Sequence, residues 1–256
     1  MDLGLQDKRA IVFGSTSGLG RCIAETLAAE GALVAITGRR EHVAAEVASS
    51  LCGAVAITGD IIQPGEASRV VEEAALSLGG LDICVVNTGG GRPGGMLDVT
   101  AEDEATAYES MLRPALAIGR AAVPHLRDGG NGRLIYITAR SIIETSPELA
   151  LSSVYRSGVA AAARSLSVEL APDVLVNVVV PGQFDTPALG RFQAAQAANE
   201  GTTIEGLRAD HLETIPIGRF GRAQELADLV AFLSSENASF ITGSIIRIDG
   251  GAVRGF

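Results

Sequence analysis

Short runs of consecutive apolar residues recur along the chain and alternate with longer segments of helical periodicity. The first run is residues 10–13, and the segment after it, to about Ala29, has Ile23, Leu27 and Ala28 on one helical face. Strands without polar alternation are typical of a sheet that helices cover on both faces, so the pattern predicts an α/β fold, a doubly wound parallel sheet of about seven strands. The other apolar runs are residues 33–37, 54–57, 83–86, 134–137, 174–180 and 244–248.

One segment breaks this rhythm. Residues 187–215 are polar and Ala-rich, contain three glycines and have few strand-forming residues. The segment follows the carboxyl end of a predicted strand, where doubly wound sheets bind ligands. Two interpretations remain open: a pair of surface helices, or a mobile lid over a ligand cleft, which we favour. Since no linker, charge block or repeat divides the chain, we expect one domain over residues 1–256.

Composition narrows the classes of partner. The 256 residues are 47% hydrophobic and carry 30 Asp and Glu against 20 Lys and Arg, a formal net charge of −10. A net negative charge of this size repels nucleic-acid backbones and anionic lipid, so a phosphate-bearing ligand must be held by local groups of the site. No apolar run approaches the roughly 18 residues needed to span a bilayer, and the first residues lack the positive charge of a signal peptide. We expect a cytoplasmic protein that binds neither nucleic acid nor membrane.

The cysteines and histidines are few and widely spaced, which favours neither a disulfide framework nor a metal site. We expect free thiols, surface or hydrogen-bonded imidazoles, and no bound metal. The residues concerned are Cys22, Cys52, Cys84, His42, His125 and His211.

A glycine-rich turn, Gly-Ser-Thr-Ser-Gly-Leu-Gly at residues 14–20, lies between the first predicted strand and the first predicted helix. Glycines there let the backbone approach a pyrophosphate closely, and the helix N-terminus offers unpaired N–H groups with a partial positive charge. This context favours dinucleotide binding over a merely structural turn. The predicted phosphate-binding residues are Gly14, Ser15, Ser17, Gly18, Leu19 and Gly20.

The end of the second predicted strand bears on which dinucleotide binds. A site for an unphosphorylated adenosine ribose has Asp or Glu there, whereas this chain has Gly38 followed by Arg39 and Arg40. Arginine accommodates a 2′-phosphate through charge-assisted hydrogen bonds. We therefore favour NADP(H) over NAD(H); the alternative is that both arginines only form the solvated start of a helix.

The motifs resemble those of the short-chain dehydrogenase/reductase family, a group of Rossmann-fold enzymes, over nearly the whole chain. The family's glycine motif is matched by Gly14, Gly18 and Gly20. The resemblance implies an oxidoreductase that transfers hydride between a nicotinamide cofactor and a small, largely uncharged carbonyl or alcohol. It also implies assembly as a homotetramer or homodimer. The further cofactor-binding residues that it implies are Asp60, Ile61, Asn87, Gly89, Arg156, Pro181, Gly182 and Thr186.

The reactive residues of the family are replaced here. Its Tyr and Lys fall on Ser152 and Arg156, its Ser falls on Ala139, and its Asn falls on Met111. A serine hydroxyl is a far weaker acid than a phenol. Arginine stays protonated, so Arg156 can hold the nicotinamide ribose but hardly relays a proton.

Neighbouring hydroxyls offer substitutes, which makes Ser152, Tyr155, Arg156 and Ser141 the candidate catalytic residues. Tyr155 lies three residues past Ser152, on the same face of a predicted helix. Ser141 lies two residues past Ala139, on the same side if the strand continues that far. One hypothesis is that Tyr155 and Ser141 form a displaced acid and a polarising donor; the alternative for Tyr155 is a packed aromatic side chain, which we favour.

Two other functions remain open. The first is a non-catalytic NADP-binding protein, because such a protein does not need the four reactive residues that are replaced here. A non-redox enzyme similar to the family's dehalogenating relatives is the second, because those relatives also have Arg at the Lys position. They lose the dinucleotide glycines and keep the Ser and Tyr, however, which is the reverse of this chain.

Overall fold

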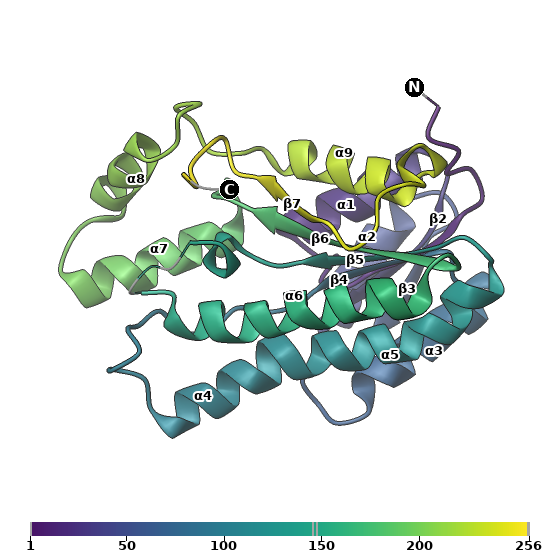
Figure 1. The fold of residues 1–256 in the computed structure, drawn as a ribbon, viewed down its shortest axis with the longest axis horizontal. Helices are drawn as coiled ribbons and strands as arrows, with labels where there is room; N and C mark the ends of the chain where they lie inside the picture. The colour runs from purple at the N-terminus through teal and green to yellow at the C-terminus, as the bar shows by residue number, and fades with distance from the viewer. Residues whose placement is uncertain (1, 145, 147, 255–256) are drawn as a thin grey trace.

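Seven parallel strands form a single sheet (Figure 1). The computed structural model describes residues 2–144, 146 and 148–254. The strands are β1 (Arg9–Val12), β2 (Leu33–Gly38), β3 (Val55–Thr58), β4 (Ile83–Asn87), β5 (Gly132–Ile137), β6 (Val174–Pro181) and β7 (Ile245–Ile248). Their order is β3-β2-β1-β4-β5-β6-β7. Because the chain starts mid-sheet and turns back between β1 and β4, a ligand crevice is expected at the carboxyl ends of these two strands.

Helices pack on both faces of the sheet, as the unbroken apolar runs predict. Successive strand residues point to opposite faces: Ile11 and Phe13 belong to one core cluster, Ala10 and Val12 to the other. The first cluster includes α3 (Glu66–Leu78), α5 (Arg113–Asp128) and α6 (Ala150–Leu170). The second includes α1 (Gly18–Ala29), α2 (Glu41–Ser49) and α9 (Ala223–Ser234). Shorter elements are α4 (Ala101–Ala107), a π-helical turn η1 (Tyr108–Leu112) and the 3-10 turns η2 (Arg140–Ile142) and η3 (Glu236–Ala238).

The predicted α/β fold is confirmed, and each predicted strand agrees with the observed one to within two residues at either end. The assumption that the fifth strand continues to Ser141 is wrong. β5 ends at Ile137, and the chain then turns through η2. None of the helices in the described ranges is long and apolar enough to cross a membrane.

An ion pair joins the amino ends of the two central strands. Arg9 Nε lies 2.9 Å from Asp82 Oδ2, and Arg9 Nη2 donates to Asp82 Oδ1 at 2.9 Å. Burial raises the pKa of Asp82, but hydrogen bonds from the Arg9 side chain and backbone more than offset it, so the pKa lies below its ordinary value. The pair fixes β1 beside β4 at the end opposite the crevice.

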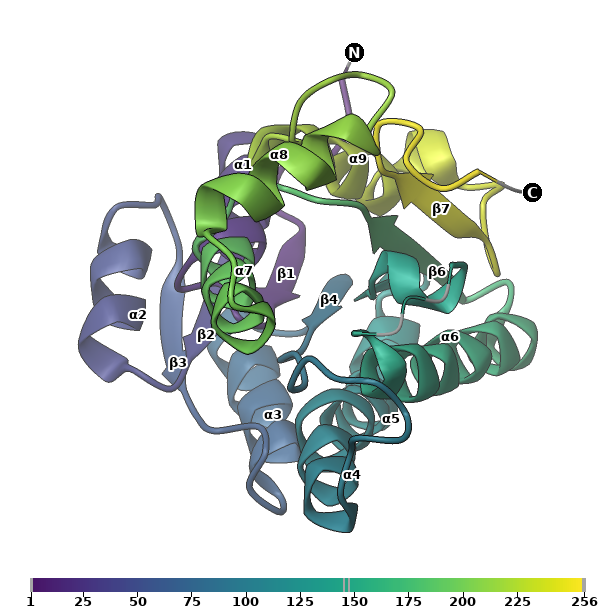
Figure 2. The same ribbon diagram turned by 90° about the vertical axis from the view of Figure 1, so that its left-hand side faces the viewer.

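The segment at residues 187–215 forms two helices, α7 (Pro187–Glu200) and α8 (Ile204–Glu213). Thr186 and Thr203 begin them, because their hydroxyls accept hydrogen bonds from Leu189 N at 3.3 Å and Gly206 N at 3.1 Å. Figure 2 looks onto the carboxyl ends of the strands and shows both helices at this end of the sheet. The helix pair is confirmed; its closure as a lid stays a prediction.

Candidate active site

The glycine-rich turn connects the carboxyl end of β1 to the amino end of α1. Ser17 occupies the N-cap position but makes no side-chain capping bond, and the first turn of α1 contains no acidic residue. The N–H groups of Gly18, Leu19 and Gly20 find no acceptor within the described part of the chain. Free N–H groups at the positive end of a helix are what a pyrophosphate requires.

Close backbone packing explains the glycines of this turn. A methyl group added at Gly20 would lie 2.4 Å from the backbone oxygen of Gly14. Gly14 itself has φ +67° and leaves room for the amide of Asn87 at the end of β4. Across the crevice, a methyl group added at Gly18 would lie 3.8 Å from Cβ of Thr186. The turn, the end of β4 and the start of α7 therefore surround one space.

Ser15 supports the turn from beneath. Its buried hydroxyl donates to Val12 O at 2.7 Å and accepts from Thr37 N at 2.7 Å, while its N–H donates to Thr37 O at 3.1 Å. Both polar groups of Ser15 are thus used inside the protein. The geometry favours a supporting role for Ser15 over the direct phosphate contact expected from the sequence.

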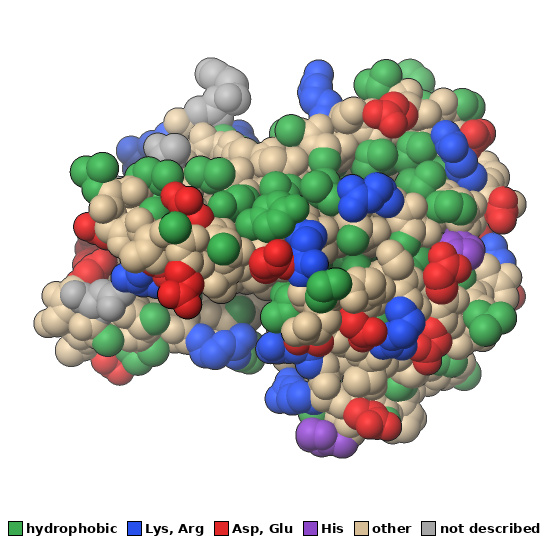
Figure 3. Space-filling view, turned by 90° about the horizontal axis from the view of Figure 1, so that it is seen from below, with side chains coloured by type: hydrophobic (Ala, Val, Ile, Leu, Met, Phe, Trp, Pro, Cys, Tyr) green, Lys and Arg blue, Asp and Glu red, His purple; other side chains and the backbone are tan. Residues whose placement is uncertain are grey.

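The two arginines after β2 are free to meet a ligand. Both Arg39 and Arg40 are exposed, and neither forms an ion pair with a residue in the described ranges. A methyl group added at Gly38 would lie 2.5 Å from Cγ2 of Thr16, so the place of the NAD-type acidic side chain is filled by the turn. Figure 3, in which the molecule is seen from below, shows a hollow with side chains of Lys and Arg along part of its border.

A pair of serine hydroxyls lies at the end of β5. Ser141 Oγ and Ser152 Oγ are 2.9 Å apart and share a hydrogen bond. Ser141 is 2% exposed, whereas Ser152 is half-buried. The η2 turn, rather than a continued strand, carries Ser141 to the start of α6. The structure therefore brings two of the predicted catalytic residues together.

Tyr155 takes a different direction from the one that the displaced-acid hypothesis requires. Its ring packs on Tyr108 with the centroids 6.3 Å apart, and it lies against an apolar cluster that contains Met111 and Leu151. Ser141 pairs with Ser152 instead of Tyr155. The packed-aromatic alternative fits this geometry.

Met111, which the family resemblance predicts to stand in place of an Asn, has an apolar side chain. It is fully buried on η1, and the Thr88 hydroxyl donates to Met111 O at 3.3 Å. The π-helical turn at this point is the kind of irregularity that often marks a functional site. A thioether has no hydrogen to donate, so the side chain of Met111 cannot take part in a proton relay.

Arg156 joins the carboxyl ends of two strands. Its Nη2 donates to Gly89 O at 2.9 Å and its Nη1 to Ile137 O at 3.4 Å. Burial lowers the pKa of Arg156 to about 10. The side chain is still a cation at neutral pH, beside the serine pair.

The remaining predicted cofactor residues follow the same edge of the sheet. Asp60 and Ile61, both half-buried, come just after β3. Gly182 comes directly after β6 and packs closely against the chain near Asp249. A methyl group added at Gly182 would lie 2.7 Å from Cα of Asp249. The structure thus gathers at this edge Gly14, Ser17, Gly18, Leu19, Gly20, Arg39, Arg40, Asp60, Ile61, Asn87, Gly89, Arg156, Pro181, Gly182 and Thr186.

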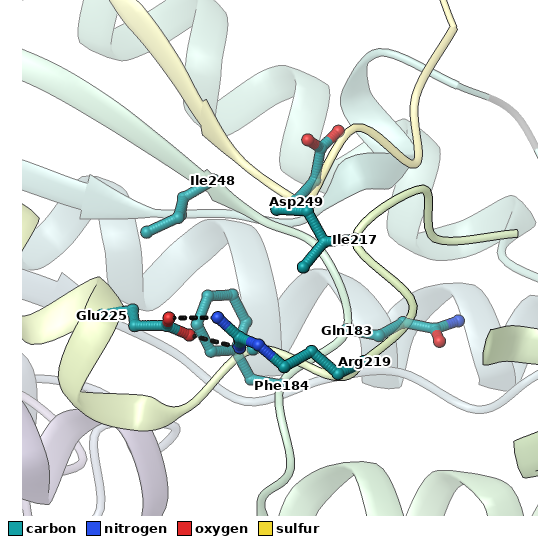
Figure 4. Close-up of a pocket in the computed structure, with 9 residues that line it drawn as sticks. Gln183, Phe184, Ile217, Arg219, Glu225, Ile248 and Asp249 are labelled. Atoms are coloured by element: carbon teal, nitrogen blue, oxygen red, sulfur yellow. Dashed lines mark hydrogen bonds and ion pairs between the residues drawn. The ribbon is translucent and has the colours of Figure 1, made fainter.

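A second hollow, of about 190 Å³, lies beside the ends of β6 and β7 (Figure 4). Two of its charged groups are paired, since Arg219 donates to both oxygens of Glu225 at 2.9 and 2.6 Å, and the third, Asp249, accepts hydrogen bonds from Gly251 N and Val253 N. Gln183 borders this hollow, and Figure 4 shows its amide pointing away from the Arg219–Glu225 pair. Its Oε1 is buried with no hydrogen-bond partner among the described atoms. Sequence reasoning missed Gln183, although a polar residue directly after Pro181–Gly182 was a visible signal.

Comparisons with known proteins agree with this geometry. Residues 14–253 match the profile of a family described as enoyl-(acyl carrier protein) reductase. The 3-oxoacyl-[acyl-carrier-protein] reductase FabG of Aquifex aeolicus is 32% identical over 257 residues, which cover 98% of this chain and 99% of that protein. The structure of L-sorbose reductase from Gluconobacter frateurii, complexed with NADPH and L-sorbose, has a TM-score of 0.92 at 29% identity and full coverage of both chains. Actinorhodin polyketide ketoreductase with NADPH has a TM-score of 0.90 at 25% identity, covering 96% of this chain and 97% of the other.

Proposed function

The chain belongs to the short-chain dehydrogenase/reductase family, and on that premise we propose that it binds NADP(H) in the β1–β4 crevice and uses the Ser141–Ser152 pair to polarise its substrate. It is an NAD(P)-dependent oxidoreductase that transfers hydride between a nicotinamide and a carbonyl or alcohol group. The observation that carries the proposal is the 2.9 Å contact between Ser141 Oγ and Ser152 Oγ, next to Arg156.

The residues present fit the cofactor. The free N–H groups of Gly18, Leu19 and Gly20 receive the pyrophosphate, and the glycine packing lets it approach the backbone. Arg156 stays charged at neutral pH and offers guanidinium hydrogens to the nicotinamide ribose. The relatives crystallised with NADPH support a nicotinamide cofactor. Arg39 and Arg40, which are exposed and form no ion pair with the described residues, support the phosphorylated form.

The Arg39→Ala/Arg40→Ala double variant is expected to raise the Kd for NADPH about 10- to 100-fold and to leave the Kd for NADH within about twofold. Each charge-assisted hydrogen bond to the 2′-phosphate contributes roughly 1.5–3 kcal/mol, and NADH lacks that phosphate. Fluorescence titration with both nucleotides measures the change. Arg164→Ala, an exposed arginine on α6, is the control. Equal loss of NADPH and NADH affinity would contradict the assignment of the two arginines.

The serine pair supplies one free hydroxyl hydrogen. Two hydroxyls hold two hydrogens, and the bond between them uses one. Because Ser141 is almost fully buried, we assign Ser141 as the donor to Ser152, which leaves the hydrogen of Ser152 for the substrate oxygen. Hydrogen bonds in such a chain strengthen one another. The pair thus stabilises negative charge that develops on this oxygen.

When bound in the crevice, the nicotinamide cofactor would supply the hydride, with its two electrons, for the new C–H bond at the carbonyl carbon of the substrate. The oxygen then takes a proton. Ser152 cannot release its own near neutral pH, because a serine hydroxyl is much less acidic than the tyrosine phenol it replaces. We assign the proton to water, and the role of Ser152 to hydrogen bonding. The same groups serve the reverse reaction, in which the substrate hydroxyl loses its proton to water.

Two further features of the family are carried over as proposals. Closure of α7 and α8 over the crevice would exclude bulk water from the serine pair. Assembly as a homotetramer or homodimer is the expected state in solution, and size-exclusion chromatography with light scattering measures it.

A further inference from the structure

The loop of residues 59–63 follows the carboxyl end of β3 and contains two of the predicted cofactor-binding residues. Gly59 N donates to Gly38 O at 3.1 Å, so this loop is joined to the end of β2. The arginines that we propose for the 2′-phosphate come directly after Gly38. The loop therefore borders the place where the adenosine half of the cofactor would lie.

A guanidinium on α3 holds the first end of this loop. Arg69 Nη2 donates at 2.5 Å to the carbonyl oxygen of Thr58, the last residue of β3. The guanidinium also donates to both oxygens of Glu66, at 2.7 and 2.9 Å, and to Glu73 Oε2 at 2.5 Å. Arg69 is exposed, so these ion pairs contribute little to the stability of the whole protein. Their local effect is to orient the planar guanidinium toward the loop.

A second guanidinium, on α5, holds the other end of the loop. The half-buried Arg113 donates through Nη2 to the carbonyl oxygen of Ile62, which lies 51 positions away in the sequence. The same nitrogen is paired with Glu109, four residues earlier on η1. Each of the two arginines is thus held by a carboxylate close to it in the sequence and binds one backbone carbonyl of the β3–α3 connection. The two helices that carry them lie side by side on one face of the sheet (Figure 2).

Resting on the proposed function, we propose that Arg69 and Arg113 are positioning residues that hold the loop of residues 59–63 in the conformation that receives the adenosine half of NADP(H). The carbonyl groups that they bind lie on either side of Asp60 and Ile61, the predicted cofactor-binding residues of this loop. Each arginine acts through the loop backbone and need not touch the cofactor. A loop that is already ordered loses less conformational entropy when the ligand binds, which raises the affinity.

The two halves of the cofactor test this role separately. Adenosine 2′,5′-bisphosphate represents the adenosine half, and nicotinamide mononucleotide represents the nicotinamide half. Arg113→Met keeps an unbranched side chain but removes the hydrogen-bond donors. It is expected to raise the Kd for adenosine 2′,5′-bisphosphate and for NADPH about tenfold, and to leave the Kd for nicotinamide mononucleotide within about twofold. Calorimetry measures the first two constants, and ligand-observed NMR measures the third.

Further variants separate positioning from loss of charge or of stability. Arg113→Lys keeps a cation that can donate to Ile62 O, and it is expected to stay within about threefold of the wild type for all three ligands. Arg69→Met/Arg113→Met frees both ends of the loop and is expected to raise the Kd for adenosine 2′,5′-bisphosphate about 50-fold or more.

Arg127→Met is the matched control. Arg127 is also an arginine of α5, and its Nη2 donates to a backbone carbonyl, that of Glu169, at 3.4 Å. It lies near the C-terminal end of α5, however, which leads to the amino end of β5 at the opposite edge of the sheet. Arg127→Met is expected to leave all three dissociation constants unchanged. Melting temperatures show that each variant folds.

Amide hydrogen exchange of the free protein gives a readout that needs no cofactor. The N–H groups of Gly59 and Gln63 are both hydrogen-bonded, to Gly38 O at 3.1 Å and to Asp60 O at 2.8 Å. Their exchange is expected to become at least about fivefold faster in Arg69→Met/Arg113→Met, because the loop opens more often, and to be unchanged in Arg127→Met.

The possible failures point to different statements. Loop exchange that the double variant leaves unchanged, or an equal loss of affinity for both halves of the cofactor in Arg113→Met, would overturn the inference. A wild type that binds neither NADPH nor adenosine 2′,5′-bisphosphate would overturn the proposed function, and with it the role of the loop in binding. The exchange measurement fails only if the two arginines do not hold the loop, so the two failures are distinguishable.

Discussion

Replacing Ser152 with Ala is expected to lower kcat for carbonyl reduction about 100-fold and to leave the Kd for NADPH within about twofold. Removing a single donor aimed at a developing oxyanion has this order of effect in other enzymes. Here the substitution removes the hydroxyl hydrogen of Ser152 that is free to bind the substrate oxygen, because Ser141 is almost fully buried and donates to Ser152. Ser141→Ala removes the donor behind it and is expected to have a smaller effect of the same kind.

Transfer of deuterium from labelled NADPH to the ketone measures the effect of Ser152→Ala on the reduction step directly. The wild type and Ser152→Ala are incubated with [4,4-²H₂]NADPH and a panel of ketones, and mass spectrometry follows the rate at which one deuterium enters the product. The matched control is Ser153→Ala, since Ser153 is the next residue on α6 and its hydroxyl donates to Leu149 O at 3.0 Å. Turnover by Ser152→Ala at the wild-type rate would refute the role of the serine pair. A wild type that binds NADPH but transfers no deuterium would be the non-catalytic nucleotide-binding protein.

Gly20→Ala is expected to raise the Kd for NADPH about 100-fold or more. The new methyl group would lie 2.4 Å from the backbone oxygen of Gly14, and a backbone atom cannot rotate out of the way as a side chain can. The turn must open, which moves the N–H groups of Leu19 and Gly20 off the pyrophosphate. Losing one or two hydrogen bonds to a charged group corresponds to this loss of affinity.

Loss of stability alone must be separated from loss of the phosphate site. Val71→Ala on α3 is the control, because Val71 is fully buried in the core on the other face of the sheet and its truncation costs about 2 kcal/mol. Both variants are expected to melt at lower temperature than the wild type, and only Gly20→Ala is expected to lose NADPH affinity. Wild-type affinity in Gly20→Ala would show that the turn does not hold the phosphates.

The sheet could be predicted because its strands are buried on both faces. A strand such as β6, in which all eight residues are buried, has no room for polar alternation, so its apolar run is visible in the sequence. The glycine-rich turn could also be predicted from the sequence, because residues 14–20 lie between an apolar run and a segment of helical periodicity. The physical reason for Gly38, contact with the side chain of Thr16, became visible only in the structure.

The details of the reactive site depend on contacts between distant segments, which local pattern does not encode. Ser141 was expected to share a strand face with Ala139, yet it reaches Ser152 through a 3-10 turn. Tyr155 has the same helical spacing from Ser152 whether it faces the crevice or an apolar cluster, so spacing could not decide between the two.

Calorimetric titration of NADPH into the wild-type protein at near-physiological salt tests the central claim most directly. If the β1–β4 crevice holds a nicotinamide nucleotide, as we propose, heat release must saturate at one nucleotide per chain in the micromolar range. No saturable heat from either NADPH or NADH up to millimolar concentration would contradict that account.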